Sequence, residues 1–156
     1  MYRKLRIAVL SLVVFSVAVW AADDPLIGAW KLNLAKSKFS GSSPSRSDTM
    51  KYEPYGAGGM KQTREILTAE GKTLREEFSA NYDGKDYPIT GTPNVDTVSL
   101  KRIDAYTTVT TNKKAGKITT TIRSVVSRDG KTLTTTTTGT NATGAKINNV
   151  RVWDKQ

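Results

Sequence analysis

The sequence predicts an all-β fold, an up-and-down antiparallel β-barrel of eight to ten strands. Residues 26–34 alternate the apolar side chains of Trp30, Leu32 and Leu34 with mostly polar ones, which is the period of a half-buried strand. Short glycine turns then recur at the spacing of long hairpins, and no pattern of helical period persists for three turns. A meander of long strands has edges that must be covered, so closure into a barrel is favoured over a sandwich.

The first 21 residues have the three parts of a secretory signal peptide. Three basic residues precede an apolar run, residues 7–19, which ends in the small-residue pattern of a cleavage site at Ala21. The alternative is a retained membrane anchor, but the apolar run is shorter than the roughly 20 residues that a spanning helix needs. We therefore expect cleavage after Ala21 and one domain over residues 22–156.

Charge and cysteine content indicate the compartment and the class of partner. The formal net charge of +10 falls to +7 once Arg3, Lys4 and Arg6 leave with the signal peptide. Since the positive charges are spread along the chain, solvated strand faces are the favoured interpretation, and peripheral contact with an anionic membrane surface is the alternative. Basic clusters interleaved with aromatic residues are missing, so no nucleic acid is expected. The absence of Cys, together with the short signal, indicates a bacterial protein that is periplasmic or secreted. We expect it to be a monomer.

The composition argues against an enzyme. The chain has no His and no Cys, which removes the usual general base, the thiol nucleophile and most transition-metal ligands. Glu76 and Glu77 are adjacent on a predicted strand and would point to opposite faces, so they cannot act as a glycosidase pair. We expect no catalytic residue, no metal and no cofactor.

The predicted elements follow one another as hairpins. The Ser-rich residues 40–47 predict a loop, and residues 48–53 a second strand. Turns are predicted at Gly71, Gly84, Gly116, Gly130 and Gly144. These glycines are 13 or 14 residues apart, except for one gap of 32 that predicts a further turn at residues 102–105. Strands are expected at residues 60–67, 73–81, 97–103, 106–112, 118–126, 132–140 and 147–154, with residues 87–89 as a short edge strand.

A charged pair is predicted inside the barrel. If residues 69–71 form a three-residue hairpin loop with a glycine bulge, the register of the flanking strands is set. It produces three facing pairs, namely Ile66 with Leu74, Arg64 with Glu76, and Gln62 with Phe78. Arg64 and Glu76, with Phe78 on the same face, would then be candidate ligand-binding residues. A shift of the register by one residue would instead place both charges in solvent.

The first and last strands carry a family resemblance. The opening strand has Gly28-x-Trp30 and the closing strand has Arg151-x-Trp153, and with these the chain resembles the calycins, the group of lipocalins and fatty-acid-binding proteins. The resemblance spans roughly residues 26–155, and the turn-rich middle resembles small secreted bacterial proteins of the lipocalin-like type. It departs from the fatty-acid-binding proteins at the Ser-rich loop, where those proteins have two short helices.

The resemblance implies two alternative roles for Arg151. In lipocalins, the arginine of the last strand packs over the tryptophan of the first, so Arg151 would close the barrel floor together with Gly28 and Trp30. In fatty-acid-binding proteins, the closing arginine holds a ligand carboxylate, so Arg151 and Trp153 would contact a ligand. Both alternatives remain open at this point.

A third set of candidates lies in the Thr-rich half of the chain. Tyr106, Thr108 and Thr110 share one face of a predicted strand and would either line the barrel or cover its outside. We therefore expect a binding protein for a small hydrophobic or amphipathic molecule, with Tyr106 among the ligand-binding residues. The alternative is a filled barrel that acts through its surface as an envelope-associated or inhibitory partner.

Overall fold

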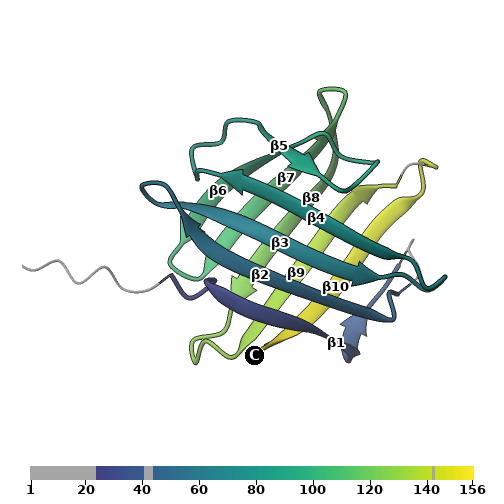
Figure 1. Ribbon diagram of the computed structural model, residues 1–156, viewed down its shortest axis with the longest axis horizontal. Coiled ribbons are helices and arrows are strands. Elements are labelled where there is room, and N and C mark those ends of the chain that lie inside the picture. Colours follow the sequence, from purple (N-terminus) through teal and green to yellow (C-terminus); the bar gives the residue numbers. More distant parts are fainter. Residues whose placement is uncertain (1–23, 41–43, 142) are drawn as a thin grey trace, which may run out of the picture.

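A computed structural model describes residues 24–40, 44–141 and 143–156. These residues form strands and no helix (Figure 1). The strands are β1 (Gly28–Lys38), β2 (Ser47–Tyr55), β3 (Gly59–Leu67), β4 (Thr73–Ala80), β5 (Tyr87–Thr90), β6 (Thr97–Asp104), β7 (Thr107–Lys114), β8 (Lys117–Val126), β9 (Thr132–Thr140) and β10 (Lys146–Lys155). The predicted signal peptide, residues 1–21, lies outside the described residues.

The ten strands close into one antiparallel barrel in which every strand pairs with its neighbours in sequence (Figure 1). The last strand, β10, returns to β1, and Trp30 on β1 pairs with Lys155 on β10. The predicted up-and-down barrel is confirmed, as is the expectation that its first and last strands meet near Trp30. The closure joins the two end strands of the meander, which is how such a sheet avoids association through its edges. The pairing is sparse beside β5, which forms two residue pairs with β4 and two with β6.

The β3–β4 hairpin has the register that its loop predicts. Arg64 pairs with Glu76 and Gln62 with Phe78 across the two strands. The turn is closed by the backbone N–H of Thr68, which donates to the carbonyl of Lys72 at 2.9 Å. This local loop therefore places Arg64 and Glu76 side by side on the inner face of the barrel.

Three boundaries differ from the prediction. Residues 87–89 were expected to form an edge strand. Instead, β5 is part of the barrel wall, between β4 and β6, and forms two residue pairs with each of these strands. The turn expected at residues 102–105 begins later, because β6 continues through a bulge as far as Asp104. The opening strand β1 runs on to Lys38, and its register with β10 shifts after Asn33.

Part of the apolar core lies around Trp30, where the start of β1 pairs with the end of β10. Trp30 is fully buried there, and its indole N–H donates to the carbonyl of Leu26 at 2.9 Å. Lys155 lies over the ring of Trp30, with Nζ at 5.0 Å from the ring centroid. We call this end, formed by Leu26, Gly28, Trp30 and Lys155, the floor.

In the part of the chain that the structure describes, no helix is long and apolar enough to cross a membrane.

Candidate ligand-binding site

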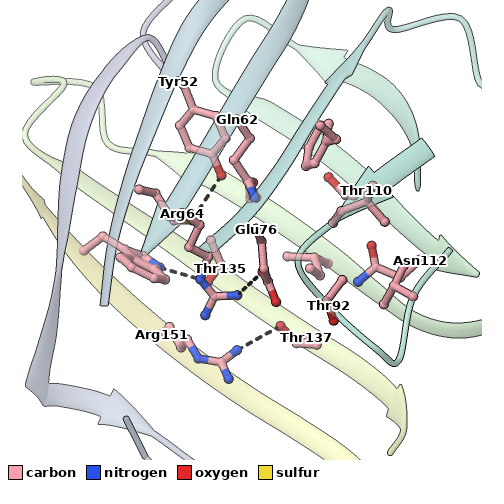
Figure 2. A pocket seen from close by; sticks show the side chains of 17 residues that line it. Tyr52, Gln62, Arg64, Glu76, Thr92, Thr110, Asn112, Thr135, Thr137 and Arg151 are labelled. Atoms are coloured by element: carbon pink, nitrogen blue, oxygen red, sulfur yellow. Dashed lines mark hydrogen bonds and ion pairs between the residues drawn. The ribbon is translucent and has the colours of Figure 1, made fainter. Parts of the chain in front are cut away.

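A cavity of about 120 Å³ lies inside the barrel, away from the floor (Figure 2). Eight strands contribute side chains to it, together with the segment that follows β5. Its lining is Met50, Tyr52, Gln62, Arg64, Glu76, Phe78, Ile89, Thr92, Val95, Thr110, Asn112, Ile122, Ser124, Thr135, Thr137, Arg151 and Trp153. Most of these side chains can form hydrogen bonds, which makes the cavity more polar than the predominantly apolar lining of most small-molecule sites.

Arg64 occupies one wall and is bound by two carboxylates. Its Nε donates to Oδ1 of Asp48 at 2.9 Å and its Nη2 donates to Oδ2 at 2.5 Å, a bidentate pair. Its Nη1 donates to Oε2 of Glu76 at 3.2 Å. Burial opposes the charged form of Arg64, but the two carboxylates outweigh burial and raise the pKa of this guanidinium. Arg64 is therefore a fully paired, permanent cation.

Arg151 points into the cavity from β10, and it has fewer hydrogen-bond and ion-pair partners than Arg64. Its Nη1 donates to the hydroxyl of Thr137 at 3.4 Å, and its guanidinium lies 5.4 Å from the ring centroid of Phe39. Among the described residues, it forms no ion pair. Burial, together with repulsion from Arg64, lowers the pKa of Arg151 to about 10. The side chain is still protonated at neutral pH, so a positive charge with unused donors faces the cavity (Figure 2).

Trp153 forms part of the same wall. Its indole N–H donates to the hydroxyl of Thr135 at 3.1 Å, and the guanidinium of Arg64 lies 5.7 Å from its ring centroid. The predicted site residues Arg64, Glu76, Phe78, Arg151 and Trp153 thus line one cavity. Their roles in ligand binding stay a prediction, but their proximity is a feature of the structure.

The predicted packing of Arg151 over Trp30 is wrong. The cation over Trp30 is Lys155, and Arg151 lies over Phe39 instead. The reason is the register of β10, which aligns Lys155 with Trp30. Arg151 is four residues away along the strand, or roughly 13 Å at the rise of an extended chain.

Gly28, which was predicted to belong to the barrel floor with Trp30 and Arg151, lies against the side chain of Lys155. A Cβ on Gly28 would lie 2.8 Å from Cε of Lys155, and the φ angle of +132° is one that residues with side chains rarely adopt. The absence of a side chain at this position lets the stem of Lys155 cross Trp30.

Tyr106 was predicted to line the ligand site, but it lies outside the cavity. It sits in the turn between β6 and β7, where Arg128 packs over its ring at 4.4 Å from the centroid. Its carbonyl accepts a hydrogen bond from the backbone N–H of Val126, which places it where β8 ends. Of the predicted Thr-rich face, Thr110 reaches the cavity.

Asp48 is the important residue that the sequence analysis did not single out. It is 1% exposed and gives both carboxylate oxygens to Arg64. The signal was present in the sequence, because Asp48 shares the inward positions of its strand with Met50 and Tyr52. An acidic residue in such a position requires a buried cation as partner.

A second hollow, of about 440 Å³, adjoins the cavity, and both are lined by Arg64 and Arg151. Its other walls include Phe39, the segment before β2, and the tip of the β3–β4 hairpin at Glu70. We call this end of the barrel the mouth. A molecule entering from the mouth would pass the two arginines before it reached the cavity.

No protein-family model and no curated protein sequence matches this chain. The barrel is, however, similar to solved structures. It matches a mutant of the fluorescent protein UnaG with a TM-score of 0.58 and 15% identity, over 85% of this chain and 96% of that one. Wild-type UnaG gives 0.54 and 16%, over 83% and 96%. The zebrafish ileal bile acid-binding protein complexed with cholic acid gives 0.49 and 13%, over 85% and 99%.

The match to UnaG, together with the closed ten-strand barrel, shows a calycin-type fold. At this level of identity the likeness concerns the fold and carries no residue of a neighbour's site to this chain.

Proposed function

We propose that this protein binds a small amphipathic molecule inside its barrel and that Arg151 contacts an acidic group of that molecule. The observation that carries the proposal is Arg151 itself, a half-buried cation in the cavity wall. Among the described residues, its one hydrogen bond is a long one to Thr137. A carboxylate would supply the bidentate, charge-assisted contacts that this guanidinium lacks. Phe78, Ile89 and Ile122 offer apolar contacts to the rest of the molecule.

The size of the cavity limits the ligand. An engineered cavity of about 150 Å³ in another protein admits benzene, and a water molecule takes roughly 30 Å³. The present cavity of about 120 Å³ therefore holds a molecule of a few non-hydrogen atoms, or the head of a longer one that extends into the mouth. The lipocalin-like resemblance also supports the binding of a small molecule.

Native mass spectrometry of the protein purified from its own host tests this proposal. We expect a co-purifying small molecule of defined mass that is lost in Arg151→Gln. The matched control is Arg128→Gln, which removes an arginine that also stacks on an aromatic ring but lies outside the cavity. Retention of the molecule by Arg151→Gln, or its loss from both variants, would contradict a role of Arg151 in binding.

The volume of the cavity also favours a second candidate, a filled barrel that acts through its surface. About 120 Å³ is below the range of roughly 300–1,000 Å³ typical of small-molecule sites. A clean apo mass from a folded protein would support this candidate and direct attention to a protein partner in the cell envelope.

The proposed compartment is the periplasm or the extracellular space, and it rests on the signal-peptide pattern of residues 1–21. Cell fractionation, with the mass of the exported chain, would test the compartment and the cleavage after Ala21 together. Peripheral contact with anionic membranes stays a weaker proposal that depends on the net positive charge alone.

A further inference from the structure

Glu76 and Arg151 both point into the cavity, where Arg64 also lies (Figure 2). Glu76 lies on β4 and Arg151 on β10, and β1, β2 and β3 separate these two strands around the closed sheet. Within the described residues, no ion pair joins the two side chains. A molecule in the cavity therefore meets both an anionic and a cationic group that are not bound to each other.

Both side chains have hydrogen-bonding capacity to spare. Glu76 accepts from Arg64 through Oε2, at 3.2 Å, and no hydrogen bond from the described residues reaches its Oε1. Asp48 differs, because both of its oxygens are used by Arg64. Arg151 uses Nη1 for one hydrogen bond of 3.4 Å to Thr137, although a guanidinium has five N–H donors.

The charges of the cavity region already cancel. Asp48 and Glu76 are balanced by Arg64 and Arg151, and attraction to the two carboxylates partly offsets the burial that lowers the pKa of Arg151. A simple carboxylate would add one uncompensated negative charge to this buried region, and a simple amine would add one positive charge. Unbalanced charge in a protein interior is costly, so a molecule that carries both charges fits best.

We infer that the ligand is a small zwitterion of the α-amino acid type, with its carboxylate on Arg151 and its ammonium group on Glu76. The inference rests on the proposed function, since it names the class of ligand for the same cavity. The volume of about 120 Å³ suits a molecule of this size. Thr110 and Asn112 add neutral hydrogen-bonding groups to the lining.

Three probes with the same number of non-hydrogen atoms test the inference. L-alanine carries both charges, L-lactate lacks the ammonium group, and L-alaninamide lacks the carboxylate. We expect isothermal titration calorimetry to show that L-alanine binds at least about tenfold more tightly than either analogue. The indole N–H resonance of Trp153, assigned with Trp153→Phe, should shift on binding because this side chain lines the cavity.

A variant of Glu76 provides the sharper test. Glu76→Gln removes the carboxylate that would bind the ammonium group and leaves an excess positive charge in the cavity. The preference for L-alanine over L-lactate should then be lost or reversed, so that L-lactate binds at least as tightly as L-alanine. The matched control is Glu77→Gln on the same strand, whose side chain pairs with Lys61 outside the cavity and should leave the preference unchanged. If Glu76→Gln does not fold, Arg151→Lys serves instead: it keeps both charges and should retain the order of the probes at lower affinity.

The outcomes separate the inference from the proposed function. Equal binding of L-lactate and L-alanine, unaffected by Glu76→Gln, would overturn the zwitterion and leave a carboxylate-binding barrel. A host-derived ligand of another class, held through Arg151, would do the same. No shift of the Trp153 resonance with any probe, together with a clean apo mass, would overturn both.

Discussion

Trp30 and Trp153 lie on neighbouring strands of the same barrel, and their surroundings differ in a way that separates stability from binding. Both are buried, at 0% and 1% exposed. Each indole N–H has an acceptor, the Leu26 carbonyl for Trp30 and the Thr135 hydroxyl for Trp153. Each ring also has a cation nearby, Lys155 in the floor and Arg64 in the cavity wall. The two tryptophans are thus satisfied in the same ways.

The difference lies in the side chains beside them. Trp30 packs at the floor with Leu26, and the inward position next to it on β1 is Leu32. Trp153 shares its wall with Arg64 and Arg151, which need polar partners and cannot close the space by apolar packing. The region around Trp30 is therefore filled by apolar side chains, whereas a cavity of about 120 Å³ remains beside Trp153. We conclude that the floor is packed for stability, whereas the cavity region, for which we propose ligand binding, lacks some of that packing.

The largest expected effect is at the floor. Trp30→Ala should lower the free energy of unfolding by roughly 3–5 kcal/mol, because it removes a large buried side chain and leaves a void. Urea unfolding followed by circular dichroism measures the change. Leu34→Ala, on the same strand but with Leu34 41% exposed, is the control and should cost much less. A loss below about 1 kcal/mol for Trp30→Ala would contradict the assignment of the floor as the stabilising end.

A smaller loss is expected when the buried ion cluster is broken. Asp48→Asn should lower the free energy of unfolding by about 3 kcal/mol, because Arg64 loses its bidentate partner inside the barrel. Glu77→Gln removes one partner of an outward-facing pair with Lys61 and should leave the urea midpoint close to that of the parent. Equal urea midpoints for Asp48→Asn and Glu77→Gln would show that the buried ion pair of Asp48 contributes no more to stability than the exposed pair of Glu77.

Replacement of the whole cluster sharpens the same comparison. The combination of Asp48→Leu, Arg64→Met and Glu76→Leu should restore the free energy of unfolding to within about 1 kcal/mol of the parent, since apolar packing can replace a buried ion cluster. Ligand binding should be lost in the same protein. A combined variant less stable than Asp48→Asn alone would mean that the charges are needed for the fold itself.

Much of the fold was predictable because its determinants are local. Strand alternation and glycine turns are read from neighbouring residues, and the three-residue loop before Lys72 sets the register that pairs Arg64 with Glu76. The opposite faces of Glu76 and Glu77 follow from the same periodicity: the first lines the cavity, and the second pairs with Lys61 outside it.

The errors concern pairings between residues far apart in sequence. No local loop sets the register between β1 and β10, so the level of Arg151 relative to Trp30 could not be read from the chain, and the resemblance suggested the wrong partner. Thr92, which follows β5, also reaches the cavity, from a segment without periodicity. Tyr106 has the parity of an inward residue, but its turn lies beyond the cavity. The alternation of residues along a strand therefore predicts whether a side chain points inward or outward, but not its position along the barrel axis.

The smallest effect, and the one with opposite sign, is expected at Arg151. Its folded-state pKa of about 10 lies below the ordinary value of an arginine, so the folded protein holds this proton less tightly than the unfolded chain does. At neutral pH the residue is charged in both states, and its burial therefore costs folding free energy that would be regained only as the pH rises above about 10. Arg151→Met should raise the free energy of unfolding by less than about 1 kcal/mol, because the loss of a charge that balances Asp48 and Glu76 offsets most of the gain, and it should abolish ligand binding. Urea unfolding and calorimetry of the same variant measure both. A variant that lost stability and retained its ligand would reverse the assignment of the two regions, because Arg151 would then belong with Trp30 among the residues that hold the barrel together.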